Sequence, residues 1–238
     1  RLSKSLSESF GTYCLVFFGA GTAASLACAG APPFVAHSLT ALSFGVVVTV
    51  MILLFGDHSG AHLNPAVSVG FIVAQRLSLR DGLAYITGQC AGAILASITL
   101  ERVLSFYDSV DVTGIEAAMT RPAVPQSVAF GLEALLTAIL MFVILRVATG
   151  AKERGAYAAF AIGATVFLAA AAFGPITGAS MNPARSLGPA VALLTREDLW
   201  VYLSAPVVGA LAAVGVAAVA VAPPAVAVAV AVAFAVAG

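Results

Sequence analysis

Long apolar stretches separated by short polar segments dominate this chain. Each has the roughly 18 to 25 residues that an α-helix needs to cross a hydrocarbon core of about 30 Å. Proline pairs and charged residues interrupt them, at Pro32-Pro33, between 101 and 125, and at Lys152-Glu153-Arg154. The pattern predicts an all-α membrane protein with six transmembrane helices, at about 7–30, 37–55, 82–100, 127–148, 156–173 and 199–222.

Composition supports a lipid bilayer as the surroundings of these helices. Of the 238 residues 61% are hydrophobic and 9% are charged, and the mean hydropathy is +1.05. A soluble protein of this size would have too little polar surface to cover its core. The net charge is zero, so nothing indicates a nucleic-acid partner. The first apolar run is too long for a signal-peptide core and lacks a clear cleavage site, so we interpret it as a span.

Cysteine and histidine offer no cofactor or metal site. An odd number of cysteines cannot form a complete disulfide set, and Cys14, Cys28 and Cys90 lie in apolar segments as small hydrophobic residues. The three histidines have no spacing typical of a metal site. No nucleophile with a plausible base or orienting partner is found, so the sequence predicts neither an enzyme nor a cofactor.

A twelve-residue segment occurs twice. Residues 59–70, SGAHLNPAVSVG, and residues 177–188, TGASMNPARSLG, are identical at seven positions. Both contain Asn-Pro-Ala, at Asn64, Pro65 and Ala66 and again at Asn182, Pro183 and Ala184. Asn caps the free N–H groups of a first helical turn, and Pro suits the first helical position. Each copy therefore predicts a helix start within an internal duplication.

The position of the two copies predicts an inverted repeat. Three spans separate them, and because three is odd, the second half has the opposite orientation in the membrane. The helices after each motif, 64–74 and 182–193, cover only about half a bilayer at 1.5 Å per residue. We expect two re-entrant half-helices that meet near the midplane with Asn64 and Asn182 in contact. The predicted domain spans 1–222, with halves of about 1–110 and 120–222, and is followed by a low-complexity Ala/Val tail at 223–238.

Irregular backbone is expected just before each half-helix, at 57–63 and 174–181. Such backbone is tolerated at membrane depth only where it is buried in protein or lines a wet cavity. A pore explains both segments. Its wall is expected to present backbone carbonyl groups from Gly60, Ala61, His62, Gly178, Ala179 and Ser180.

The ends of the half-helices suggest what such a pore passes. Each helix N-terminus carries about half a positive charge, and two of them facing one point disfavour a cation there. The amides of Asn64 and Asn182 would donate hydrogen bonds to a neutral solute, while loop carbonyls accept from it. Arg185 lies within the second re-entrant segment, where a charge is costly unless it faces a polar path. We expect passage of small uncharged solutes and exclusion of protons and ions.

Charges in the connections predict the orientation. Seven cations fall on one side, whereas Arg102, Arg121 and Arg196 fall on the other. By the positive-inside rule both termini are cytoplasmic. The third connection, 101–125, is then external, and its mildly acidic composition predicts a solvated loop. The seven cytoplasmic cations are Arg1, Lys4, Arg76, Arg80, Arg146, Lys152 and Arg154.

Two carboxylates occupy matching places in the two halves. Glu8 and Glu133 each precede a threonine by four residues, Thr12 and Thr137. Ionisable residues in spans are often functional, which would make this pair a proton relay. Alternatively, each carboxylate is a buried acceptor for loop N–H groups.

The paired Asn-Pro-Ala motifs, the arginine after the second one and the opening ESFGT at 8–12 resemble the major intrinsic proteins, the aquaporins and aquaglyceroporins. The resemblance runs from about residue 7 to residue 220. It implies a homotetramer with one channel per subunit and a loop-supporting role for Glu8 and Glu133. The side chain of His62, next to the first motif, could line the pore, but we expect its backbone carbonyl to contribute instead. The segment 177–189 is similar to the nodulin-26-like branch and its bacterial relatives, which pass water, glycerol and metalloid hydroxides such as boric or arsenious acid.

The resemblance also implies a selectivity filter of Phe44, Ala170, Ala179 and Arg185. Water-selective members usually have histidine where this chain has Ala170, so we expect a wider constriction. Ala179 stands where some members carry a mercury-reactive cysteine, so mercury is not expected to block the pore there. Ser186 and Ala190 instead resemble water channels, which keeps a strictly water-selective aquaporin as the alternative. Asp57-His58 departs from the usual His-Ile without a clear consequence.

Two other classes remain as less favoured alternatives. Secondary active transporters also have inverted repeats and broken helices, but the sequence shows no obvious coupling-ion site. A structural junction protein would rely on the external loop, which is unremarkable. The expected location is a plasma or inner membrane. The alternating tail is too short to cross a bilayer as a helix and has no predicted function.

Overall fold

The computed structural model describes residues 2–106, 116–148 and 155–221, and in those residues all regular structure is helical. The Ala/Val tail lies outside them. Six helices are long and apolar enough to cross a membrane, which confirms the prediction from the hydrophobic pattern. They cover Leu2–Cys28, Pro33–Ser59, Leu79–Leu104, Gln126–Val147, Gly155–Thr177 and Leu199–Ala218.

The first span consists of three consecutive pieces, and the other spans are single helices. The three pieces are α1 (Leu2–Cys14), a π-helical turn η1 (Leu15–Ala20) and α2 (Gly21–Cys28). The remaining spans are α3 (Pro33–Ser59), α5 (Leu79–Leu104), α7 (Gln126–Val147), α8 (Gly155–Thr177) and α10 (Leu199–Val221). Two short helices, α4 (Pro65–Val73) and α9 (Pro183–Ala192), have the positions and lengths predicted for the half-helices.

The helices extend beyond the apolar runs that predict them. α1 begins at Leu2 rather than near residue 7, because a helix continues past the hydrocarbon into polar surroundings that hydropathy does not count. α3 continues through Asp57 and His58 to Ser59, and α8 continues to Thr177. The irregular backbone is therefore shorter than the predicted 57–63 and 174–181. It begins only at two glycines with left-handed backbone, Gly60 (φ 91°) and Gly178 (φ 84°).

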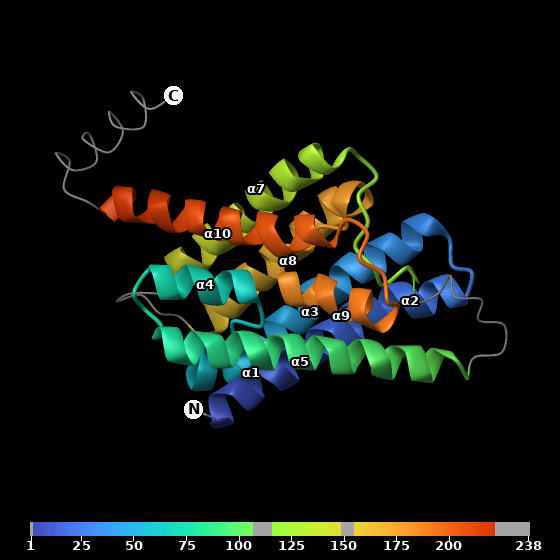
Figure 1. The fold of residues 1–238 in the computed structure, drawn as a ribbon, viewed down its shortest axis with the longest axis horizontal. Coiled ribbons are helices and arrows are strands. Elements are labelled where there is room, and N and C mark those ends of the chain that lie inside the picture. The colour runs from blue at the N-terminus through green and yellow to red at the C-terminus, as the bar shows by residue number, and fades with distance from the viewer. Residues whose placement is uncertain (1, 107–115, 149–154, 222–238) are drawn as a thin grey trace.

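The two halves of the chain lie together as an inverted pair. In Figure 1, α4 and α9 lie between α10 and α5, α4 toward one end of the molecule and α9 toward the other. Each half-helix packs against the last span of both halves, since α4 and α9 each contact α5 and α10. The N-terminus and the last turns of α10 lie at the same end (Figure 1).

Corresponding helix pairs approach each other at corresponding glycines. α1 packs against α5, and α7 packs against α10. A Cβ atom at Gly92 would overlap the carbonyl oxygen of Ser9, and one at Gly209 would overlap that of Ala134. Small residues let membrane helices pack by close backbone contact, which replaces the hydrophobic driving force that lipid removes. The rigid helix pairs built in this way hold α4 and α9 at the centre.

Candidate functional site

The two half-helices begin with the same cap. The side-chain oxygen of Asn64 accepts from the N–H of Ala66 at 2.9 Å. That of Asn182 accepts from the N–H of Ala184 at 3.0 Å and from Arg185 at 3.3 Å. Proline follows each asparagine at the first helical position, where a missing N–H costs nothing. Both caps have the form that the Asn-Pro-Ala motif predicts.

Each cap also reaches across to the other half. The amide nitrogen of Asn64 donates to the Met181 carbonyl at 2.7 Å, and that of Asn182 donates to the Leu63 carbonyl at 2.8 Å. This reciprocal pair joins the N-termini of α4 and α9 directly. An amide nitrogen carries two hydrogens, so one on each asparagine is engaged in holding the halves together and one is left for another acceptor.

The loops before the half-helices have an unusual backbone. Besides the two glycines, Ala61 (φ 44°), Leu63 (φ 52°), Ala179 (φ 40°) and Met181 (φ 51°) are left-handed. Residues other than glycine disfavour this conformation, and they keep it only where contacts with the surrounding structure enforce it. Left-handed residues stand at corresponding positions of the two loops, 60, 61 and 63 and 178, 179 and 181. This indicates that the backbone conformation of the loops, rather than their side chains, is what the two halves share.

Two buried carboxylates supply the groups that hold these loops. Glu8 accepts from the N–H groups of His62 at 3.0 Å and Leu63 at 2.7 Å. Glu133 accepts from those of Ser180 at 2.9 Å and Met181 at 2.8 Å. Both side chains are fully buried. Each of the four carboxylate oxygens accepts from a loop N–H group, an arrangement suited to support of the loops rather than to proton transfer.

The support continues through residues that the sequence analysis did not single out. Ser59 donates to Glu8 at 2.7 Å and Thr177 donates to Glu133 at 2.8 Å. Tyr85 donates to the Ser59 carbonyl at 2.7 Å, and Tyr202 donates to that of Thr177 at 2.6 Å. A signal for the tyrosines exists in the sequence, because both begin the pattern Tyr-x6-Gly-Ala on the last span of their half.

The first half has an additional set of polar contacts. Gln89 donates to Glu8 at 2.8 Å and to Ser68 at 3.0 Å, and Ser68 lies 3.1 Å from the Nδ1 atom of His62. In the second half Pro206 stands 117 residues after Gln89, at the place that corresponds to it. His62 is therefore fixed through its ring as well as through its backbone.

A cavity of about 580 Å³ runs along the joined loops. Both cap asparagines line it, as do Gly60, Ala61 and His62 of the first loop, and Ala179 and Ser180 of the second loop. Within the described part of the chain, no protein donor reaches the carbonyl oxygens of Gly60, Ala61 and His62. Backbone carbonyls at this depth require a partner, and a solute in the cavity can supply it.

Some predicted residues lie behind the wall. Pro65, Ala66, Pro183 and Ala184 are buried in the first turns of the half-helices and do not line the cavity. Gly178 also does not line it, and packs against Thr120 instead. These residues shape the helix starts, whereas the asparagines and the loop residues face the cavity.

All four residues predicted for the filter line the cavity. They come from different elements: Phe44 from α3, Ala170 from α8, Ala179 from the second loop and Arg185 from α9. The guanidinium carbon of Arg185 lies 4.9 Å from the centre of the Phe44 ring, a cation–π contact. Arg185 also donates to the Ala118 carbonyl at 3.3 Å.

The third connection corrects one prediction. It was expected to be solvated, yet Ala118 and Thr120 are 3% and 4% exposed. Thr120 donates to the Ser186 hydroxyl at 2.8 Å, next to the arginine that Ala118 binds. Two of its charged members, Arg121 and Glu116, do remain at the surface, where they form an ion pair at 3.5 Å. The connection folds back onto α9 because the first turn of that helix offers partners for its polar groups.

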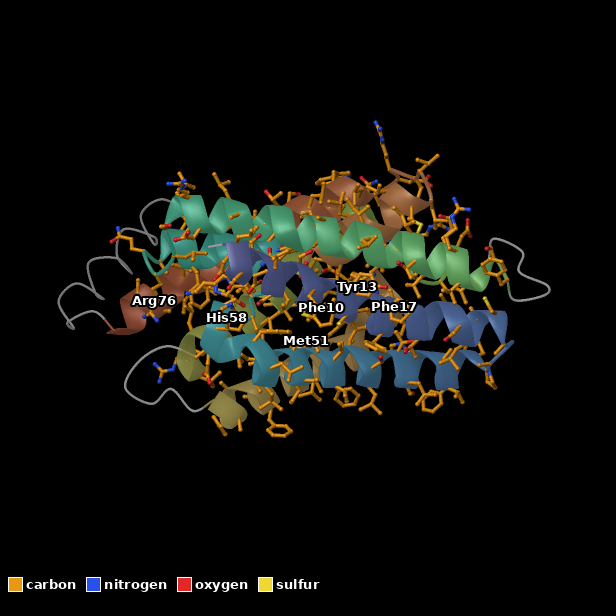
Figure 2. The ribbon with its side chains drawn as sticks, turned by 90° about the horizontal axis from the view of Figure 1, so that it is seen from below. Phe10, Tyr13, Phe17, Met51, His58 and Arg76 are labelled. Atoms are coloured by element: carbon orange, nitrogen blue, oxygen red, sulfur yellow. The ribbon has the colours of Figure 1, made fainter. Side chains whose placement is uncertain are left out.

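Charged and polar residues gather at the other end of the cavity. Lys4, Asp57, His58 and Arg76 line it there, and all four are exposed. His58 and Arg76 lie toward the same end of the molecule (Figure 2). The imidazole of His58 is 2.8 Å from the Ser3 hydroxyl, so this part of α3 is tied to the start of α1. This end of the molecule also carries the start of α1 (Figure 1).

Comparison with known proteins gives consistent results. The profile of the family described as "Major intrinsic protein" matches residues 1–217. The chain is 41% identical to nodulin-26 of Glycine max over 215 residues, covering 90% of this chain and 76% of that protein. It is 41% identical to aquaporin NIP3-1 of Arabidopsis thaliana over 212 residues, covering 89% of this chain but only 65% of the relative's length.

A solved structure has the same fold. The aquaglyceroporin from Plasmodium falciparum superimposes with a TM-score of 0.81 at 27% sequence identity. The match covers 90% of this chain and 95% of that one. The family match and the structural neighbour therefore agree on one fold for this chain.

Proposed function

We propose that this chain, which belongs to the major intrinsic protein family, is a passive channel for water and for small neutral solutes that include glycerol and metalloid hydroxides such as boric and arsenious acid. The family consists of channels rather than enzymes, so a water or small-solute channel is the coarse function. The wider range of solutes is the specific proposal. The observation that carries it is the presence of alanine at two of the four filter positions, Ala170 and Ala179.

In the proposed pathway a solute forms hydrogen bonds in turn with groups that only donate and with groups that only accept. Arg185 donates at the filter, and the remaining amide hydrogens of Asn64 and Asn182 donate at the centre. The loop carbonyls of Gly60, Ala61 and His62 accept from the solute along the wall. Boric acid, arsenious acid and glycerol carry hydroxyl groups that both donate and accept, which fits this alternation.

Exclusion of cations follows from the same geometry. The N-termini of α4 and α9 meet at the centre, and each carries about half a positive charge. Arg185 adds a full charge at the filter. A cation that leaves water there is repelled by these positive charges in a medium of low dielectric constant, whereas a neutral hydroxyl compound is not.

The test is the flux of each solute through the full chain reconstituted in liposomes, compared with the variant Ala170→His. A histidine would add a bulky polar side chain to the cavity wall that Ala170 and Phe44 both line. We expect glycerol, boric acid and arsenious acid permeability to fall about tenfold, as about 1.4 kcal/mol of added barrier would produce. Water permeability should change much less.

Ala172→His is the matched control, because Ala172 lies on the same helix but is exposed and does not line the cavity. Its permeabilities should equal those of the wild type. Unchanged solute flux in Ala170→His would contradict the assignment of the constriction.

A strictly water-selective aquaporin is the second candidate, favoured by Ser186 and Ala190 in α9. Ser186 contacts Thr120 and Ser180 and is buried beside the filter arginine. Wild-type liposomes that pass water but no glycerol or metalloid acid would establish this candidate in place of the first.

The proposal includes the surroundings of the channel. The chain is a multi-pass membrane protein. We place it in a plasma or inner membrane with both termini in the cytoplasm, and propose a homotetramer in which each subunit has its own pore. Among the seven cations used for this orientation, Arg1, Lys152 and Arg154 lie outside the residues that the structure describes.

A further inference from the structure

The π-helical turn η1 interrupts the first span at the depth of the filter. Its wider winding is visible in the N–H of Gly21, which reaches the carbonyl of Val16 five residues earlier as well as that of Phe18. The corresponding span of the second half, α7, is a continuous α-helix over Gln126–Val147. Single π turns inside α-helices occur frequently at functional sites. The interruption therefore distinguishes the first half, which contributes Phe44 to the filter.

The turn touches Phe44 through a glycine. Gly19 is buried, and a Cβ atom built on it would overlap three ring carbons of Phe44, namely Cδ1, Cε1 and Cζ. The ring is thus seated directly on the backbone of the turn. Phe44 lines the cavity and Gly19 does not, so a side chain at Gly19 would displace the ring toward the cavity.

A second contact fixes α3 on the same turn. The hydroxyl of Ser43, the residue before Phe44, donates to the carbonyl of Phe18 at 3.0 Å. Thr22 donates to the same carbonyl at 2.6 Å and lies 3.1 Å from the Ser43 hydroxyl. The Phe18 carbonyl of the π turn therefore accepts from α3 as well as from its own span. Two adjacent residues of α3 are therefore positioned by two adjacent residues of the turn.

We propose that η1 supports the ring of Phe44, the aromatic residue of the filter, and that Gly19 is a positioning residue for solute selectivity. It acts through Phe44, by letting the ring stay against the backbone of the turn rather than extend further into the cavity near Arg185. The inference rests on the proposed function, because it concerns the width of the same constriction. The first span supplies none of the four filter residues, yet in this proposal it controls the size of the solute that passes.

The test is the ratio of glycerol to water permeability in liposomes containing the full chain with Gly19→Ala. We expect the ratio to fall roughly tenfold, the factor that about 1.4 kcal/mol of differential barrier produces. Gly21→Ala is the matched control two residues along, since its Cβ would meet only the flexible end of Leu100, at 2.8 Å, and Leu100 does not line the channel cavity. The control should keep the wild-type ratio.

A rescue experiment separates positioning from general packing. With Phe44→Leu the ring is absent, so adding Gly19→Ala should leave the ratio of the Phe44→Leu channel unchanged. If Gly19→Ala alone fails to reach the membrane, the double variant should restore both assembly and that ratio.

An unchanged or increased ratio in assembled Gly19→Ala would overturn the inference, as would the same loss with leucine at position 44 or a double variant that fails to assemble. A wild-type chain that passes neither water nor glycerol would instead refute the proposed function, so the two failures are distinguishable.

Discussion

Glu8 and Glu133 are the residues on which the two loops depend most directly. Each oxygen of Glu8 accepts from a loop N–H, with Ser59 and Gln89 as further donors. Glutamine at either position keeps the shape but replaces one acceptor oxygen by a donor nitrogen, which faces another donor. We expect Glu8→Gln and Glu133→Gln to lower the free energy of unfolding in detergent by about 2 kcal/mol or more, because bonds to charged groups are the stronger ones.

Glu116→Gln is the control for charge removal. Its ion pair with Arg121 is exposed, so the loss should stay below about 1 kcal/mol. Thermal unfolding in detergent measures the stability of the glutamine variants and of the control, and water flux measures their channel activity. Glutamine variants as stable as the control would show that the loops are held by something else.

We expect the residue at position 179 to determine the response to mercury. It lines the cavity at the filter, whereas Cys14, Cys28 and Cys90 do not line it. We expect wild-type water flux to be insensitive to mercuric chloride, and Ala179→Cys to become sensitive, with recovery on adding a thiol. Inhibition of the wild type to the same extent would mean that another cysteine controls the pathway.

The residues proposed for the filter could be located because the resemblance to the family places them at fixed distances from the two motifs. Phe44, Ala170, Ala179 and Arg185 do converge on one cavity. Their partners could not be found in this way. Ala118 lies in a connection without a motif, and its role depends on a backbone carbonyl, which any residue type would provide.

At the scale of elements, glycines decide how closely the helix pairs approach. Gly92 and Gly209 each face a carbonyl oxygen of the neighbouring helix, leaving no room for a methyl group. Gly92→Ala and Gly209→Ala should each lower stability by about 1 to 3 kcal/mol through overpacking.

Gly131→Ala provides the contrast, since Gly131 lies within α7 and a Cβ there meets nothing within 4 Å. Alanine in a helix interior is favoured over glycine by roughly 0.5 to 1 kcal/mol, so this variant should be neutral or more stable. Thermal unfolding in one detergent ranks the three. Equal effects at all three sites would indicate that helix propensity, not close packing, dominates.

The hydrophobic pattern predicts the number of spans correctly but not the residues at which the helices begin and end. Hydropathy identifies the six spans because each apolar run matches the bilayer thickness. It misses the helical character of Asp57 and His58, since α3 continues through these polar residues beyond its apolar run. It is also blind to η1, whose residues LVFFGA are as apolar as an ordinary helical turn.

At the scale of the whole molecule, the architecture follows from the duplication and from the odd number of spans between the two copies. Three spans between the copies require opposite orientations, and the structure joins Asn64 and Asn182 through reciprocal bonds to the opposite loops. The halves are nevertheless unequal around the pathway. Three of the four filter residues belong to the second half, while the first half supplies Phe44 and the π turn beneath it.

Osmotic shrinkage and swelling of liposomes containing the wild-type chain, in a gradient of glycerol, test the central claim most directly. A passive channel should accelerate water efflux and then glycerol entry relative to empty liposomes, with a low activation energy. Neither rate should depend on a sodium or proton gradient, and a pH-sensitive dye inside should report no proton flux. Rates equal to those of empty liposomes, or glycerol uptake that requires an ion gradient, would contradict the account.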